Sequence, residues 1–170
     1  MKEIYFAGGC FWGTEHFFKQ IDGVEQTEVG YANGTAANPT YQEVCTGATG
    51  HAETVHVTYD EGKVTLNDLL DMYFCAIDPT SINKQGDDEG EQYRTGIYYV
   101  DEDDLPVIEA KMAVVAARYD RPLAVEVTPL NCFYRAEDYH QDYLDNNPSG
   151  YCHLPLELFE MARRFKAGSR

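Results

Sequence analysis

The sequence contains few positive charges for its length. Of 170 residues, 13 are lysine or arginine and 29 are aspartate or glutamate, so the formal net charge at pH 7 is −16. Nucleic-acid backbones and anionic membrane surfaces bind proteins that carry an excess of lysine and arginine. The composition therefore argues against nucleic acid and against a membrane surface as partners. The acidic runs 87–89 and 101–104 are expected to be solvated loops or helix caps.

Long apolar runs are also missing. The first residues lead directly into the short strand-like run 4–7, without the apolar stretch of about 7–15 residues that marks a secretory signal. No segment reaches the roughly 20 apolar residues that span a membrane. We therefore expect a cytoplasmic protein. Its length fits one catalytic domain, residues 1–170, in which 146–170 form a C-terminal segment.

Cysteine pairs of the CxxC type and the HExxH motif of zinc enzymes are absent as well. The odd number of cysteines suits neither a secreted disulfide framework nor a zinc site of ordinary spacing. We expect thiols in a reducing compartment, no metal and no other cofactor. Three cysteines lie in apolar segments and are expected to pack in the core, namely Cys45, Cys75 and Cys132.

Periodic patterns predict the secondary structure. Apolar side chains at helical spacing predict helices after Cys10, Thr65, Pro106, Arg135 and Pro155. Alternating patterns predict strands at 24–31, 53–59, 95–100 and 123–127, beside the run 4–7, while 32–39 and 81–91 are predicted loops. One helical stripe predicted to be core consists of Val107, Ile108, Met112, Val115 and Tyr119. Because helices and strands intermix, we predict an α/β or α+β fold of two layers with a mixed sheet.

Cys10 occupies the turn at which the first predicted strand gives way to a helix. A thiol at such a turn lies near unpaired backbone N–H groups and the positive end of a helix dipole, and both favour the thiolate. The acidity of the chain opposes this effect, because nearby carboxylates disfavour a second negative charge. A cysteine that merely packs is the alternative, but flanking glycines and Trp12, the one tryptophan of the chain, favour a nucleophile.

Glu53 has the same strand parity as Val55 and Val57, which places its carboxyl on the apolar face of the predicted strand. Burial there would raise its pKa and keep part of it protonated near neutral pH, as a general acid requires. The alternative is that Glu53, at the first position of the strand, bends out to water. Both interpretations are compatible with the pattern of residues alone.

The segment Gly9-Cys10-Phe11-Trp12-Gly13 resembles the catalytic signature of the A-type peptide methionine sulfoxide reductases. The resemblance continues in the family's order through blocks at 30–32, 39–47, 50–53, 85–86, 92–94, 136–141 and 147–152. It implies a ferredoxin-like two-layer sandwich. It also implies thiol-dependent reduction of the S epimer of methionine sulfoxide, free or in proteins, which is a repair reaction of oxidised methionine.

The resemblance also implies roles for aromatic residues. Tyr41 and Tyr93 match the family's oxygen-binding tyrosines, and phenols can donate hydrogen bonds to a sulfoxide oxygen. Phe11 and Trp12 match the two rings of the methyl pocket, where aromatic faces attract groups bound to sulfur. Cys10 is then the nucleophile and Glu53 the proton donor. Ordinary core packing is the alternative for each of the four rings.

Two further site residues follow from the resemblance. Asp88 matches an acidic substrate-site residue, although its neighbours Asp87 and Glu89 make the run look like a solvated turn. Cys152 matches the resolving cysteine, which condenses with a sulfenic acid on Cys10 to form a disulfide. The turn-rich residues 146–151 could carry it toward Cys10.

The chain departs from many relatives after Cys152, where His153-Leu154-Pro155 and a predicted helix replace a glycine-rich tail with a second recycling cysteine. We therefore expect a relay of two cysteines, whose disulfide is reduced by thioredoxin or another dithiol reductant. Two other functions stay open. A thiol peroxidase would use the same sulfenic acid on peroxide, and a non-catalytic acidic binding module would use none of this chemistry.

Overall fold

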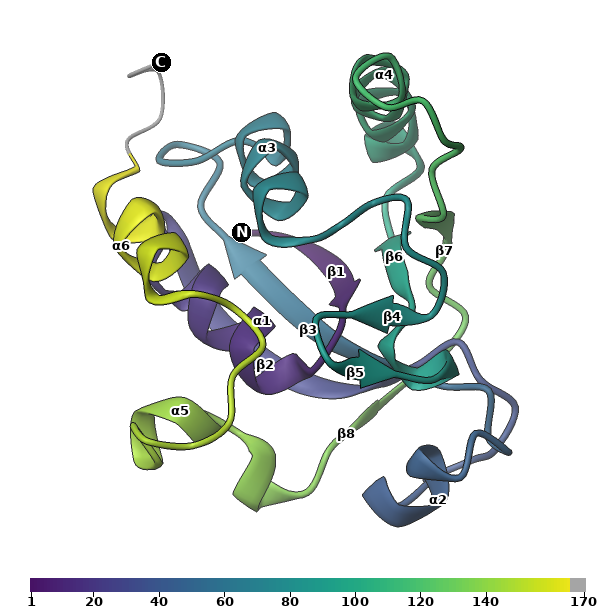
Figure 1. The fold of residues 1–170 in the computed structure, drawn as a ribbon. Coiled ribbons are helices and arrows are strands. Elements are labelled where there is room, and N and C mark those ends of the chain that lie inside the picture. The colour runs from purple at the N-terminus through teal and green to yellow at the C-terminus, as the bar shows by residue number, and fades with distance from the viewer. Residues whose placement is uncertain (166–170) are drawn as a thin grey trace.

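The computed structural model describes residues 1–165, and its centre is a six-stranded sheet (Figure 1). Residues 166–170, the end of the predicted C-terminal segment, lie outside the described part. The spatial order of the strands is β7-β6-β1-β3-β2-β8. Their bounds are β1 Lys2–Gly8, β2 Val24–Ala32, β3 Ala52–Tyr59, β6 Thr95–Tyr99, β7 Glu126–Pro129 and β8 Phe133–Arg135.

The sheet is mixed, as predicted. The strands β6 and β7 are parallel, and the other neighbouring pairs are antiparallel. The helix α1 (Phe11–Lys19) connects β1 with β2, and α3 (Leu66–Ala76) precedes β6 along the chain. The inner order β6-β1-β3-β2 with these two helices is the ferredoxin-like βαββαβ arrangement. The strands β7 and β8 extend it at the two edges.

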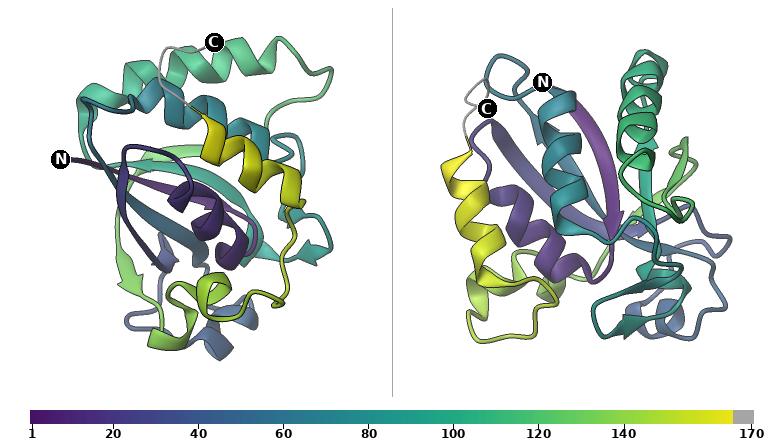
Figure 2. Two further views of the ribbon diagram at one scale, coloured as in Figure 1. Left: turned by 90° about the vertical axis from the view of Figure 1, so that its left-hand side faces the viewer. Right: turned by 45° about the horizontal axis from the view of Figure 1, so that its top comes forward.

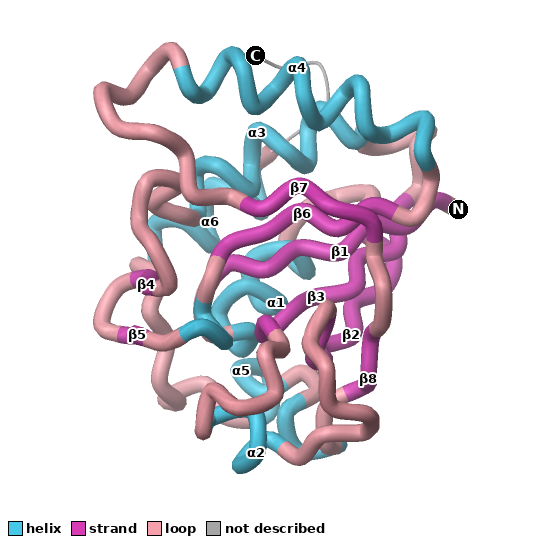
Figure 3. The backbone as a smooth tube through the Cα atoms, turned by 90° about the vertical axis from the view of Figure 1, so that its right-hand side faces the viewer, coloured by secondary structure: helices cyan, strands magenta, loops and turns pink. Residues whose placement is uncertain are grey.

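One face of the sheet is covered by helices. Both α1 and α3 pack on it, and α6 (Leu156–Arg164) lies against both helices (Figure 2). The main core lies between these helices and the sheet, with fully buried residues such as Phe6, Phe17, Val55 and Leu70. Figure 3 shows the opposite face, where the strands lie in front of α1. A smaller cluster on that face includes Tyr5, Ala52 and Tyr98.

The predictions for the three helices around the core are confirmed. In α3, the predicted cap Thr65 accepts a hydrogen bond from the Asp68 amide, and the Asp68 carboxyl accepts one from the Thr65 amide. The helix α4 (Leu105–Ala116) forms around Pro106, but the predicted core stripe is partly wrong. Its Ile108 is buried, whereas Val107 is exposed, because α4 covers α3 at the periphery and not the sheet itself.

Short elements differ most from the predictions. The strand expected at 123–127 lies at 126–129, and β8 was not expected. The predicted loop 81–91 contains a hairpin of β4 (Lys84–Gln85) and β5 (Asp88–Glu89), which turns at Gly86 with a φ of +59°. The helix α2 (Tyr41–Cys45) was also missed, although Thr40 and Glu43 form a capping box.

The long helix expected after Arg135 is replaced by the 3-10 turn η3 (Asp138–His140) and the single turn α5 (Tyr143–Asn146). The cause is tertiary, because the Gln141 side chain bonds to both the amide and the carbonyl of Val29 on β2. The prediction for the three remaining cysteines is wrong. Cys45 and Cys75 are exposed and Cys132 is half-buried.

Tyr73 links the helical layer to the sheet next to the end of β1. Its hydroxyl donates to the Ala7 carbonyl at 2.7 Å and accepts from the Gly96 amide at 3.1 Å. In Tyr73→Phe these buried backbone groups lose a partner, so we expect a loss of about 1–3 kcal/mol in the free energy of unfolding, measured in urea. The exposed Tyr119→Phe serves as control, and equal stability of the two variants would contradict the prediction.

Candidate active site

Cys10 lies at the sharp turn between β1 and α1, as predicted. Gly9 has a φ of +88°, and a Cβ there would lie 2.8 Å from the Cβ of Gln85, so only glycine fits. Cys10 is the N-cap of α1 and is 6 % exposed. The Thr14 hydroxyl is within 3.2 Å of the carbonyl oxygens of Gly8 and Cys10, which fixes the turn.

The first amides of α1 hold two reactive groups. The N–H of Phe11 donates to Oε1 of Glu53 at 3.2 Å, and the N–H of Trp12 donates to the sulfur of Cys10. These N–H groups have no acceptor within the helix, and they carry its positive partial charge. The start of α1 therefore places a carboxyl group beside a thiol.

Glu53 is buried, as its strand parity predicts. It is 1 % exposed and pairs across the sheet with Tyr31. Burial raises its pKa to about 8, against the opposing effect of the Phe11 amide, and Asp88 adds to the increase. The carboxyl is therefore mostly protonated at neutral pH. Its other oxygen, Oε2, has no hydrogen-bond partner among residues 1–165, so it can face a ligand.

The sequence left the pKa of Cys10 open between the helix start, which favours a thiolate, and nearby carboxylates, which oppose one. Burial raises the pKa of Cys10 well above its ordinary value, and the negative charge of Glu53 adds to this effect. The Trp12 amide lowers the pKa, but one hydrogen bond does not offset the loss of water around the sulfur. At neutral pH, the free site therefore holds a thiol beside a protonated carboxyl.

Tyr41 and Tyr93 both lie near the Glu53 carboxyl. Tyr41 begins α2, and Tyr93 ends the 3-10 turn η1 (Glu91–Tyr93). Both rings are half-buried, and the pKa of each is raised first by burial and then by the charge of Glu53. The two hydroxyls therefore stay protonated and can donate hydrogen bonds in this part of the molecule.

Phe11 and Trp12 form an aromatic wall next to Cys10. Phe11 is 1 % exposed, and its ring centroid lies 6.5 Å from that of Tyr41. Trp12 is half-buried and stacks on Tyr143 at 3.8 Å. Its indole nitrogen donates to Nδ1 of His140 at 2.9 Å. The sequence did not single out His140, whose only signal was its place in the block 136–141.

Asp88 is the member of its acidic run that lies close to the thiol. Asp87 and Glu89 are exposed, as expected for a solvated turn, whereas Asp88 is half-buried. Its charge contributes to raising the pKa of Cys10 and, after burial, that of Tyr151. Its Oδ2 is buried without a partner in the described residues. The structure therefore brings Asp88 to the site.

Cys152 lies against the first turn of α1. If Gly13 carried a Cβ atom, that atom would lie 3.0 Å from the Cys152 sulfur. A negative charge on Cys152 would raise the pKa of Cys10. Both cysteines are free thiols. Cys152 is half-buried and lines a surface groove with Pro148, Leu156 and other residues. The structure thus places the predicted resolving cysteine at the same helix start as Cys10.

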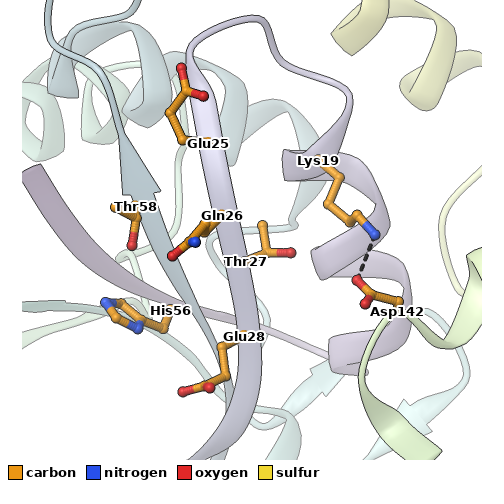
Figure 4. Close-up of a pocket in the computed structure, with 8 residues that line it drawn as sticks. All are labelled: Lys19, Glu25, Gln26, Thr27, Glu28, His56, Thr58 and Asp142. Atoms are coloured by element: carbon orange, nitrogen blue, oxygen red, sulfur yellow. Dashed lines mark hydrogen bonds and ion pairs between the residues drawn. The ribbon is translucent and has the colours of Figure 1, made fainter. Parts of the chain in front are cut away.

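A second pocket lies along the outer edge of β2, and it includes none of the predicted site residues (Figure 4). Its lining is polar, with His56 and Glu28 among the side chains that surround the strand. Lys19 closes one side through an ion pair of 2.6 Å with Asp142. This pocket is separate from the thiol chemistry.

Within residues 1–165, no group of three histidine, cysteine or acidic side chains is arranged to hold a metal ion. None of the helices in that part of the chain combines the length and apolar character needed to cross a membrane.

The protonated state of Glu53 can be tested by Glu53→Gln. A carboxyl whose pKa rises from 4.5 to about 8 on folding contributes stability that is complete below pH 4.5 and is lost as the pH rises through 8. Wild type should therefore lose stability relative to the variant over this range. The expected loss is a few kcal/mol, since one pKa unit corresponds to about 1.4 kcal/mol.

Urea unfolding at a series of pH values measures this difference. The exposed Glu61→Gln is the matched control and should follow wild type at every pH. A difference between wild type and Glu53→Gln that does not vary with pH would show that Glu53 is ionised in the folded protein.

The chain is similar to known proteins over most of its length. A family model described as peptide methionine sulfoxide reductase matches residues 2–168. The peptide methionine sulfoxide reductase MsrA of Lachnoclostridium phytofermentans is 57% identical over 95% of this chain and 98% of its own length. These matches extend over nearly the whole sequence.

Solved structures are also similar to this chain. The reduced form of Mxr1 from Saccharomyces cerevisiae has a TM-score of 0.85 and 39% identity, and the match covers 89% of this chain and 88% of that one. The complex of the same yeast protein with Trx2 has a TM-score of 0.60 and 26% identity, over 84% of each chain. With a thiol and a buried carboxyl at the start of α1, this chain belongs to the peptide methionine sulfoxide reductase family of oxidoreductases.

Proposed function

We propose that the protein reduces the S epimer of methionine sulfoxide, free or in oxidised proteins, with Cys10 as nucleophile and Glu53 as proton donor. The observation that carries this proposal is the pair of adjacent α1 amides that hold the Glu53 carboxyl and the Cys10 sulfur. The oxygen of a sulfoxide is a poor leaving group until it is protonated or strongly hydrogen-bonded. A carboxyl with a pKa of about 8 supplies that proton at neutral pH.

In the first step, the Cys10 sulfur attacks the sulfoxide sulfur. Glu53 gives its proton to the sulfoxide oxygen and regains one from the Cys10 thiol. The bond that this attack forms between the two sulfurs is then replaced by a bond between the Cys10 sulfur and the oxygen. The bond between the methionine sulfur and the oxygen breaks, so the oxygen ends as a hydroxyl on Cys10. The sulfoxide is thereby reduced to methionine and the thiol is oxidised to a sulfenic acid.

The remaining site residues bind the substrate. Tyr41 and Tyr93 donate hydrogen bonds to the sulfoxide oxygen, and their raised pKa values keep both protons in place. Phe11 and Trp12 receive the methyl group of the substrate, since aromatic rings attract groups bound to sulfur. Asp88, the first residue of β5, orients the substrate beside Cys10.

In the second step, the Cys152 thiol attacks the sulfenic acid, which forms a disulfide and releases water. The position of Cys152 beside the first turn of α1 supports this role. Thioredoxin or another dithiol reductant then reduces the disulfide, and the complex of yeast Mxr1 with Trx2 supports thioredoxin. The groove at Cys152 gives a reductant access that the buried Cys10 lacks.

Resolved epimers of a blocked methionine sulfoxide test the reaction. With a dithiol reductant, we expect turnover of the S epimer alone, and we expect Cys10→Ser to abolish it. Cys75→Ser, which removes an exposed thiol on α3, is the control and should retain wild-type turnover. Reduction of peroxide but of neither epimer would instead indicate a thiol peroxidase, and no turnover at all would indicate a binding module.

The role of Cys152 is tested separately by Cys152→Ser. This variant should release about one methionine per enzyme in a single turnover, because the first step needs only Cys10. It should then stall with thioredoxin, whereas Cys132→Ser should cycle normally. Undiminished cycling of Cys152→Ser would reject Cys152 as the resolving cysteine.

A further inference from the structure

His153 directly follows Cys152 in the chain, and no role has been given to it so far. Its half-buried ring packs against the turn that carries Cys10. A Cβ on Gly9 would lie 3.0 Å from Nε2 of this ring, and a Cβ on Gly13 would lie 3.1 Å from its Nδ1. The imidazole therefore occupies the space that these two glycines leave open at the start of α1.

The hydrogen bond to Gly8 determines which ring nitrogen carries the proton. Nε2 of His153 lies 3.1 Å from the carbonyl oxygen of Gly8, which can only accept, so Nε2 must donate. In the neutral ring, Nδ1 then has no proton. Nδ1 is buried and has no hydrogen-bond partner within residues 1–165. One nitrogen thus holds the ring in place, and the other offers a free lone pair.

The free nitrogen and the sulfur of Cys152 lie at the same small space beside α1. A Cβ on Gly13 would lie 3.0 Å from the Cys152 sulfur and 3.1 Å from Nδ1 of His153. The hydrogen bonds of the sulfur go to the backbone of Leu154. A thiol must lose its proton to attack a sulfenic acid, because the thiolate is the nucleophile. Nδ1 of His153 is placed to receive that proton.

We propose that His153 is the catalytic base of the second step and takes the proton of the Cys152 thiol at Nδ1. This inference rests on the function proposed above. The Cys152 thiolate attacks the sulfur of the Cys10 sulfenic acid, so that the bond between the two sulfurs forms and the bond between sulfur and oxygen breaks. His153 gives its proton to the departing hydroxide, which leaves as water. The step needs no further oxidant or reductant.

The surroundings of His153 suit a base that is neutral before the reaction. Burial lowers the pKa of His153 below its ordinary value of 6.5, so the ring is mostly uncharged at neutral pH. The charge of Asp88 and the bond to Gly8 raise this pKa in part. Once the ring has taken a proton, the Asp88 carboxylate stabilises the imidazolium, as the third group of a catalytic triad does.

Dimedone, which reacts with sulfenic acids, measures the second step by competition. In a single turnover of methionine S-sulfoxide, the sulfenic acid on Cys10 is either labelled by dimedone or converted to the disulfide, and intact mass separates the two products. Their ratio does not depend on the rate of the first step. Cys152→Ser has no resolving thiol and gives the fully labelled reference. Dimedone is used at a concentration that labels a minor share of wild type.

His153→Gln removes the base but keeps the bond to Gly8, because the carboxamide nitrogen can donate from near the position of Nε2. We expect the ratio of labelled enzyme to disulfide to rise about 10- to 100-fold. This is the lower part of the range of about 10²–10⁴-fold for general bases, since a thiol is partly ionised without one. His56→Gln, on the opposite face of the sheet, should match wild type.

Added imidazole distinguishes a base from a structural role. His153→Ala leaves the space of the ring open beside Gly9 and Gly13, so imidazole in solution should lower the labelled share toward that of wild type. In His153→Gln the side chain fills this space, and imidazole should have little effect. Methionine release needs only Cys10 and should stay at about one per enzyme in each variant.

The outcomes distinguish the two proposals. Wild type that releases no methionine rejects the proposed function and this step with it. Normal release with equal labelling of wild type and His153→Gln rejects the base alone. Increased labelling of His153→Ala that imidazole does not reverse shows that His153 only positions Cys152, which also rejects the base. If His153→Ala does not fold, His153→Gln still decides, because it keeps the bond to Gly8.

Discussion

The hydrogen bond from the Phe11 amide to the Glu53 carboxyl is the contact on which the site depends. It joins residues 42 positions apart in the chain and connects the start of α1 to β3. A carboxyl with 1 % exposure would have a still higher pKa without this donor, because the amide favours the charged form of Glu53. The bond also fixes the distance between acid and thiol, since Cys10 immediately precedes the donor. One backbone group thus holds Glu53 in position and limits how far burial raises its pKa.

Burial raises the pKa of both the Cys10 thiol and the Glu53 carboxyl, and this determines the protonation state of the free site. The negative charge of Glu53 raises the pKa of Cys10, so a state with both groups ionised is strongly disfavoured. The site therefore keeps two protons until substrate arrives. In the proposed first step, a sulfoxide oxygen that accepts the Glu53 proton leaves a carboxylate able to take the proton of Cys10, so Cys10 would become reactive only when substrate is bound. A permanently ionised Cys10 would be open to oxidation by peroxide.

Elements with a regular apolar pattern along the chain could be predicted from the sequence. Features that depend on contacts between distant residues could not. The parity of Glu53 with Val55 predicted its burial, and apolar spacing predicted α1 and α3. The turn η3 has three residues and no period, and it forms because Gln141 bonds across to Val29. The pKa of Cys10 depends on how completely its surroundings exclude water, which no local pattern reveals. The position of His140 beside Trp12 follows from the same contacts, so it could be seen only in the structure.

The two sides of the site are attached to the fold in different ways. On the substrate side, Glu137 bonds to Tyr31 and to the amide of Tyr41, so the segment that carries His140 is tied to β2 and α2. On the other side, the hydrogen bonds of the Cys152 sulfur go to Leu154, within its own segment. Moving Cys152 toward a sulfenic acid on Cys10 would therefore leave the bonds of Glu137 and the bond between Trp12 and His140 intact. In the proposed second step, the Cys152 sulfur would therefore move without disturbing the aromatic residues that are proposed to bind the substrate.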